Sequence, residues 1–486
     1  MSLSDPRFFA FLFSVFLVFY ALPSGAARRL FLLAASYGFY FTMSKFYIGV
    51  LLFVTGITYG GALLLRSPVV SEKGRSGLVF GLGAVLILVP LLVLRYCAGV
   101  AWLFGSWQSA LASLALPVGI SFFSFAALGY LIDCYLEVVD PERDPVRVAL
   151  FLAFFPVITA GPIERGGHFL PQLDLDRPFT AERGFAALRM ILLGLFFKAV
   201  FAALLVKPVD EIFAHPARFS ALEQLLGVVH YAFYIYADFA GYSLIAIGAA
   251  RLLGLDVVPN FQQPFLSTTI PEFWRCWHMS LSFWVRDYMF APLRMRWRRH
   301  PQIGTAAALF IAFVIIGVWH GPKWGYLWYG VIHGTYSIVS FFTLQKRTAL
   351  WARLRVPAPL VHGWRMLCTF GLVLLAFVVW RADTIHDALG IYGAIFSFRW
   401  VGEAGSALAW AAFHVGHSPG FQAVGDVRCL GAIAGLLACD VLAKRGFKVE
   451  TLPKPVQFLL YNAALLMVLS SWLNGHANQP FVYYKF

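Results

Sequence analysis

Long runs of apolar residues, separated by short polar or basic turns, follow one another along almost the whole chain. A helix needs about 20 apolar residues to cross a bilayer, and in lipid a helix satisfies its own backbone hydrogen bonds. The clear candidate spans are 8–22, 46–65, 78–95, 118–136, 185–206, 225–252, 303–319, 325–344, 364–380, 427–443 and 456–473. Shorter or broken apolar segments occupy 30–43, 98–116, 147–160, 272–292 and 385–416. The pattern predicts an all-α, polytopic membrane protein with roughly 11–14 membrane-embedded helices.

Basic residues gather in the turns between these runs and predict the orientation of the chain. Cytoplasmic loops carry an excess of Lys and Arg. Such loops lie at 66–75, 294–299, 346–355 and 444–454. Two spans, 303–319 and 325–344, separate the second loop from the third. The turn between those spans, residues 319–324, is therefore expected deep in the membrane or across it.

Composition excludes a soluble protein. The chain is 60% hydrophobic and 13% charged, whereas soluble domains are roughly 25% charged. We interpret the net charge of +14 as positive-inside topology rather than nucleic-acid binding, because the basic residues lie between apolar runs. None of the six cysteines forms a CxxC pair, so we expect no disulfide framework and no metal site.

The first candidate site breaks an apolar segment at 154–165. Pro156, Gly161 and Pro162 interrupt any helix there, and Glu164 follows them. Non-helical backbone at membrane depth is tolerated against protein or a water-filled cavity. The segment therefore predicts either a re-entrant stretch that lines a cavity, with Glu164 at its rim, or a loop at the membrane edge.

The second candidate site is the segment 270–288, which we expect to form a helix. Trp274, His278, Ser282 and Arg286 recur every four residues, a spacing that places them on one helical face. Arg275 and Asp287 add charge beside them. The alternative is an interfacial amphipathic helix with an aromatic belt.

The third candidate site is the turn that contains Trp319, His320 and Gly321. An imidazole is the side chain best suited to move a proton near neutral pH. Gly321 would let a substrate approach the backbone closely. The alternative is a structural histidine bonded to a helix end.

At these residues the chain resembles the membrane-bound O-acyltransferase family, and in particular its bacterial branch of alginate O-acetyltransferases and teichoic-acid D-alanyl transfer proteins. The matching runs are LPVGISFF at 116–123, AGPI at 160–163, YADFAGYS at 236–243 with Asp238 and Tyr242, Asn260-Phe261, the segment 272–287, VWHG at 318–321, Arg381-Ala382 and QPFVYY at 479–484. The chain departs from that branch at Arg294, in Ala291-Pro292-Leu293-Arg294, where a proline-leucine-glycine-glycine turn is usual.

The resemblance implies a ring of helices around a central funnel, with His320 as the essential histidine near its bottom and His278 as the second active-site position. It implies one membrane domain over 1–486, with a catalytic core at about 110–345 and peripheral helices at 1–109 and 360–486. The remaining candidates named above would line the funnel or bind donor: Trp274, Arg275, Ser282, Arg286, Asp287, Trp319, Gly321, Asp238, Tyr242, Gly161, Pro162 and Glu164.

The expected function is transfer of an acetyl group from cytoplasmic acetyl-CoA across the bacterial inner membrane, for O-acetylation of a surface polysaccharide such as alginate. We expect no bound cofactor, and His320 as the base, with His278 and Ser282 or Arg275 steadying the oxyanion. The basic loop at 294–300 would hold the donor's phosphates or serve topology alone. Expected partners are a periplasmic esterase-like acetyltransferase and the polysaccharide synthesis machinery.

Two rival functions stay open. One is transfer of D-alanine from a carrier protein to teichoic acid or a related polymer. The other is a transporter or flippase. A transporter built from related halves would carry paired broken segments, whereas the broken segments here cluster in the middle of the chain.

Overall fold

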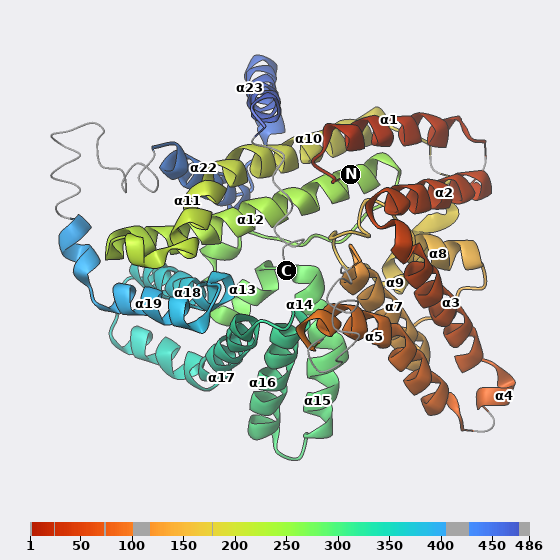
Figure 1. Ribbon diagram of the computed structural model, residues 1–486, viewed down its shortest axis with the longest axis horizontal. Coiled ribbons are helices and arrows are strands. Elements are labelled where there is room, and N and C mark those ends of the chain that lie inside the picture. The colour runs from red at the N-terminus through yellow and green to blue at the C-terminus, as the bar shows by residue number, and fades with distance from the viewer. Residues whose placement is uncertain are drawn as a thin grey trace. The chain divides into compact units, whose positions relative to one another are not determined.

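The computed structural model describes residues 2–23, 25–71, 74–100, 117–176, 178–404 and 427–475, and every regular element within these ranges is a helix (Figure 1). The predicted all-α membrane class is therefore confirmed. The chain forms two compact units. Unit 1 contains Met1–Gly194 and Tyr242–Asn260, and unit 2 contains Leu195–Gly241 and Phe261–Val482.

The elements of unit 1 are α1 (Pro6–Ala21), α2 (Gly25–Met43), η1 (Lys45–Tyr47), α3 (Ile48–Leu65), α4 (Pro68–Ser71), α5 (Ser76–Val100), α7 (Ile120–Tyr135), α8 (Pro145–Ala153), α9 (Gly166–Phe169) and η3 (Leu170–Asp174). Two helices run from one unit into the other, α10 (Ala181–Phe196) and α12 (Ala221–Leu252). The elements of unit 2 are the π-helical η4 (Phe197–Ala202), α11 (Ala203–Ala214), η5 (Pro216–Arg218), η6 (Pro264–Leu266), α13 (Ile270–Cys276), α14 (Met279–Val285), the π-helical η7 (Arg286–Phe290), α15 (Ala291–Arg296), α16 (Pro301–Trp319), α17 (Trp324–Arg353), α18 (Ala358–Arg381), α19 (Ile385–Phe396), α22 (Val427–Lys444), η8 (Val449–Thr451) and α23 (Lys454–Leu473).

Seven helical stretches in the described part of the chain are long and apolar enough to cross a membrane: Lys45–Leu65, Ser76–Tyr96, Ala181–Ala214, Ala221–Leu252, Pro301–Trp319, Ala358–Arg381 and Lys454–Leu473. Helices α17 and α22 cover two further predicted runs, and α1, α7 and α19 are shorter apolar helices. Most of the predicted run 98–116, the end of the run 385–416 and the motif at 479–484 lie outside the described residues. The total of 11–14 embedded helices stays a prediction.

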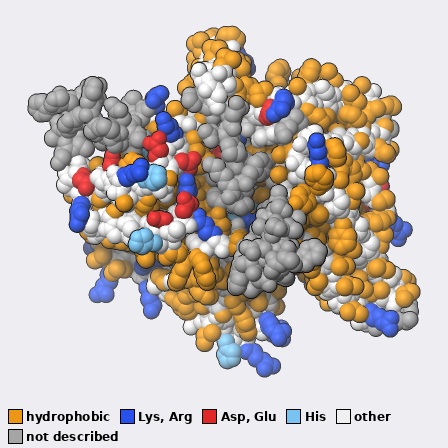
Figure 2. Space-filling view, viewed as in Figure 1, with side chains coloured by type: hydrophobic (Ala, Val, Ile, Leu, Met, Phe, Trp, Pro, Cys, Tyr) orange, Lys and Arg blue, Asp and Glu red, His pale blue; other side chains and the backbone are white. Residues whose placement is uncertain are grey.

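The spanning helices differ in how much of their surface packs inside the protein. In α12, 94% of the most apolar stretch is buried, whereas in α23 only 11% is. Helix α23 exposes Leu459, Leu466 and Leu473, and hydrophobic side chains cover it in Figure 2. A helix with so much exposed apolar surface is stable against lipid rather than water.

Helices α16 and α17 form a tight antiparallel pair in unit 2. Their backbones approach closely because glycines lie between them. A Cβ on Gly317 would stand 2.4 Å from the Tyr326 carbonyl oxygen, and one on Gly330 would stand 2.4 Å from that of Phe313. Small residues allow this approach between membrane helices. The pair therefore fixes the side chains of one helix against those of the other.

The expected helix over 270–288 is wrong in one respect, because the segment is broken at its centre. Trp277 is extended (φ −107°, ψ 127°), and His278 adopts the left-handed conformation (φ 43°, ψ 52°). The Trp277 ring is buried against Phe261, Phe273 and other aromatic rings. This packing outweighs the hydrogen bonds of a continuous helix, so His278 leaves the face that Trp274, Ser282 and Arg286 were predicted to share with it.

The predicted break at 154–165 is present and lies inside unit 1. Helix α8 ends at Ala153, and residues 154–164 form buried turns rather than an exposed loop. Gly119, with φ +78°, permits this packing, since a Cβ there would stand 2.0 Å from the Ile158 carbonyl oxygen. The motif runs at 117–123 and 160–163 are thus parts of one packed region.

Candidate functional site

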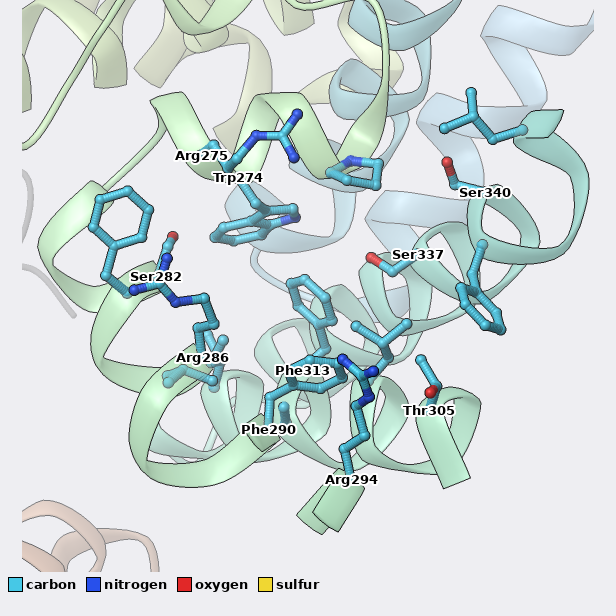
Figure 3. A pocket seen from close by; sticks show the side chains of 18 of the residues that line it. Trp274, Arg275, Ser282, Arg286, Phe290, Arg294, Thr305, Phe313, Ser337 and Ser340 are labelled. Atoms are coloured by element: carbon cyan, nitrogen blue, oxygen red, sulfur yellow. The ribbon is translucent and has the colours of Figure 1, made fainter. Parts of the chain in front are cut away.

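A cavity of about 570 Å³ lies in unit 2 between the segment α13–α15 and the pair α16–α17 (Figure 3). Its floor is mostly apolar, with the buried Trp274, Ala312 and Ile316 and the half-buried Phe313 among the lining residues. Four hydroxyl groups add polar positions to its wall: Ser282, Thr305, Ser337 and Ser340. An apolar cavity with a few polar groups is the usual form of a site for an extended organic ligand.

Three arginines stand at the exposed rim of the cavity: Arg275, Arg286 and Arg294. All three come from the broken segment α13–α15. Arg286 is held by Asp287, with its Nε 2.6 Å from Oδ1, and its guanidinium lies 4.8 Å from the centre of the Phe283 ring. Guanidinium groups recognise phosphates by charge-assisted hydrogen bonds. The rim is therefore suited to the phosphate end of a ligand whose other end is apolar.

The structure brings four predicted residues together at this cavity: Trp274, Arg275, Ser282 and Arg286. Asp287 contributes indirectly through Arg286. His278 is absent from the cavity lining. Its ring is buried and packs edge-on against Phe239, with ring centres 4.8 Å apart. Its predicted active-site role stays a prediction.

His320 directly follows the last residue of α16 and lies in the turn predicted from the sequence. The residue is only 3% exposed. Its ring packs against Trp319 and Trp380, with ring centres 4.4 and 4.3 Å away. Gly321 follows with φ +138° and turns the chain toward α17. His320 is thus held in an aromatic cluster, one helical turn beyond Ile316 of the cavity floor.

Charges divide between the two ends of the unit 2 helices. The loops 294–299 and 346–355, which lie at the same end of the α16–α17 pair, are strongly basic and define the basic end. At the opposite end, acidic residues pair with the cations, as in Arg381–Asp210 (2.7 Å) and Lys323–Asp383 (3.5 Å). Figure 2 shows this mixture of acidic and basic side chains over α11 and α19. The arginine rim lies toward the basic end, and His320 lies toward the other.

Sequence reasoning missed three residues beside the predicted site: Tyr329, His333 and Trp380. The Tyr329 ring lies 4.5 Å from that of His333 and 4.6 Å from that of Trp380. The signal was present in α17, where Tyr326, Tyr329, His333, Ser337 and Ser340 recur every three or four residues. That spacing marks one buried polar face of the helix.

Other predicted site residues are not part of the cavity lining. Asp238 forms a buried ion pair with Lys198 in unit 2. Tyr242 shares a hydrogen bond with Thr159 in unit 1, where Gly161 and Pro162 are buried. Their predicted roles in lining a funnel are untested by this geometry.

Glu164 joins two loops of unit 1. Its carboxylate accepts hydrogen bonds from the Val258 backbone N–H (2.6 Å) and from His168 Nδ1 (2.8 Å). The bond to Glu164 raises the pKa of His168 above its usual value of 6.5. Glu164 is buried and anchors the two loops, and its place at a cavity rim stays a prediction.

Comparison with known proteins gives the family to which the residues around the cavity are similar. Residues 143–354, which include the cavity and His320, match the membrane-bound O-acyltransferase family. The chain is 32% identical to a probable alginate O-acetylase of Azotobacter vinelandii over 403 residues, which is 80% of this chain and 77% of that protein. It is 28% identical to a peptidoglycan O-acetyltransferase of Helicobacter pylori over 79% of this chain and 77% of that protein.

A teichoic acid D-alanyltransferase of Streptococcus thermophilus is 31% identical over 56% of this chain and 66% of that protein. The names of all three relatives describe the transfer of an acyl group, although the polymers that they name differ. Together with the all-helical, multi-pass structure and the family match across the cavity, they show that this chain belongs to the membrane-bound O-acyltransferase family and is an O-acyltransferase.

Proposed function

We propose that this enzyme moves an acetyl group from acetyl-CoA, taken from the cytoplasm, to O-acetylate a surface polysaccharide of the alginate type. The observation that carries the proposal is the cavity of unit 2, with an arginine rim and an apolar floor that ends one helical turn from His320. The positive-inside rule supports a cytoplasmic position for the basic end. The membrane would then be the bacterial inner membrane.

The cavity suits the two chemical ends of a coenzyme A thioester. Phosphate groups would lie among Arg275, Arg286 and Arg294, where charge-assisted hydrogen bonds are strongest. The pantetheine arm would run along the apolar wall, and its amides could bond to Ser337 and Ser340. Arg294 is the residue that departs from the usual turn of the alginate branch, so its contribution to donor binding would be particular to this chain.

His320 would act as the general base. Its imidazole would accept the proton of an acceptor hydroxyl while the hydroxyl oxygen bonds to the thioester carbonyl carbon. The carbon–sulfur bond then breaks, and the proton passes from the imidazole to the thiolate of coenzyme A. The acceptor would approach from the mixed-charge end, either as a polymer hydroxyl or as a serine of a periplasmic esterase-like acetyltransferase that works with the polysaccharide synthesis machinery.

A second candidate, D-alanyl transfer from a carrier protein, is favoured by the similarity to the teichoic acid D-alanyltransferase. A carrier protein presents its thioester on the same phosphopantetheine arm, and an acidic carrier surface would suit the basic end. Labelled acetyl-CoA and a D-alanyl-loaded carrier protein, offered separately to membranes that contain the enzyme, distinguish the two donors.

The test of the proposal is acyl incorporation from labelled acetyl-CoA into alginate in membranes that contain the enzyme. We expect His320→Ala to abolish incorporation without loss of protein from the membrane. We expect Arg286→Ala and Arg294→Ala each to raise the apparent KM for acetyl-CoA about three- to tenfold with little change in kcat, because they remove partly exposed phosphate contacts. Arg353→Ala, an exposed substitution at the same end, is the control. Normal incorporation by His320→Ala would show that the base assignment is wrong.

A further inference from the structure

We propose that His333 is a positioning residue that holds Trp274 as a partition between the donor cavity and His320, and that this partition opens during acyl transfer. The inference rests on the proposed function and assigns a role to a buried histidine outside the predicted site. Trp274 lines the cavity, whereas His333 lies behind it on α17. The indole Nε1 of Trp274 donates a hydrogen bond to His333 Nδ1 at 3.2 Å.

The partition consists of aromatic rings. On the cavity side, the Trp274 ring lies 5.0 Å from that of Phe313. Behind Trp274 the rings follow in order, with centres 5.0 Å apart from Trp274 to His333 and 4.5 Å from His333 to Tyr329. Trp380 then links Tyr329 to His320. Packed rings therefore run without a break from Trp274, at the cavity, to His320.

The length of the gap follows from helix geometry. Thr305 and Ile316 both line the cavity, so it extends along α16 for about 17 Å at 1.5 Å per residue. His320 is four residues further, about 6 Å along the same axis. An acyl carbon must come within bonding distance of the atom that attacks it. The rings must therefore move before a thioester in the cavity reaches the base.

His333 is well placed to control that movement. The residue is fully buried, and because Nδ1 accepts the indole N–H, the ring is neutral with its proton on Nε2. Nε2 has no hydrogen-bond partner among the described residues. An unpaired buried donor is costly, and an apolar ring would avoid that cost. A histidine at this position is therefore explained by its Nδ1 atom, because an apolar ring would offer no hydrogen-bond acceptor to the Trp274 N–H.

A partition of this kind would also protect the donor. If the rings between Trp274 and His320 remain open after transfer, water near His320 can take the place of the acceptor hydroxyl. The water oxygen then bonds to the thioester carbon while His320 takes one proton of the water. The carbon–sulfur bond breaks, the imidazole passes that proton to the thiolate, and acetic acid and coenzyme A are released. Loss of the hydrogen bond is therefore expected to uncouple donor consumption from transfer.

The experiment measures free coenzyme A thiol and acetylated product for the enzyme in membranes that also contain the periplasmic acetyltransferase, with acetyl-CoA, with and without a mannuronate oligosaccharide. For His333→Phe we expect acceptor-independent thiol release to rise about three- to tenfold, while transfer falls. His333→Asn keeps an acceptor atom close to the position of Nδ1 and should restore coupling. Trp274→Phe keeps an aromatic ring, although a smaller one, and removes the donor N–H, so it should reproduce the effect even if His333→Phe fails to fold. Thr335→Ala, an exposed position on α17, is the control.

Adding His320→Ala to His333→Phe should remove the extra thiol release, since the leak is expected to need the base. The inference is overturned if His333→Phe and Trp274→Phe lower thiol release and transfer in the same proportion, or if His333→Asn behaves like His333→Phe. If the unmodified enzyme releases no thiol with or without the oligosaccharide, the donor assignment fails instead, and this outcome is separate from a change in coupling.

Discussion

The ion pair between Lys198 and Asp238 offers a quantitative test of how polar residues are held inside unit 2. Lys198 lies in the π-helical segment η4, and Asp238 lies in α12. Each side chain is only 3% exposed. The perturbation is Lys198→Met, which keeps the length of the side chain and removes its charge.

The expected magnitude follows from burial. Lys198→Met leaves the Asp238 carboxylate charged and desolvated, which costs about 3–5 kcal/mol of folding free energy for a buried pair. The double variant Lys198→Met with Asp238→Leu removes both charges. It should be as stable as the unmodified enzyme or up to about 4 kcal/mol more stable, because the desolvation penalty disappears with the pair.

The assay is the free energy of unfolding in detergent micelles at neutral pH, with acyl transfer measured on the same samples. Lys207→Met, an exposed lysine on the neighbouring α11, is the matched control and should change stability by less than about 0.5 kcal/mol. The reasoning is refuted if Lys198→Met is as stable as this control, or if the double variant is as unstable as the single one. A double variant that is stable but inactive would assign the pair a part in the chemistry.

Two further predictions concern helix packing and pH. Gly330→Ala places a Cβ 2.4 Å from the Phe313 carbonyl oxygen, so we expect it to separate α16 from α17. The variant should lose about 1–3 kcal/mol of folding stability, measured by thermal unfolding. Steady-state kinetics should show a lower kcat and a higher KM. The bond to Glu164 raises the pKa of His168 above 6.5, so its contribution to stability is full below pH 6.5 and is lost as pH rises through the raised value. Melting temperatures between acidic and mildly alkaline pH should therefore fall more steeply for the unmodified enzyme than for His168→Gln.

Each of these predictions has its own control or contrary outcome. Gly363→Ala is the control for Gly330→Ala, because nothing lies within 4 Å of a Cβ built at Gly363. Unchanged kinetics in Gly330→Ala would show that the helices tolerate separation. Parallel pH curves for His168→Gln and the unmodified enzyme would show that the ion pair with Glu164 does not contribute.

The sequence by itself determined where most of the helices lie. The run 303–319 became α16 (Pro301–Trp319), and the run 225–252 became α12 (Ala221–Leu252). Such spans are readable because a bilayer requires a long apolar helix whatever its neighbours are. The break at 154–165 was also readable, since proline acts on its own local backbone. Ser282 and Arg286 meet at the cavity for a similar reason, because their four-residue spacing survives within the continuous helical stretch α14–η7.

Only the tertiary structure decided which histidine faces which surroundings. The helix over 270–288 is interrupted at His278 because Trp277 is buried among rings that include Tyr236 of α12 and Phe377 of α18. His333 meets Trp274 across 59 residues of sequence, and Lys198 meets Asp238 across 40. Contacts of this kind depend on the packing of whole helices against one another, and a local pattern of hydrophobic and polar residues carries no information about the partner that each side chain meets.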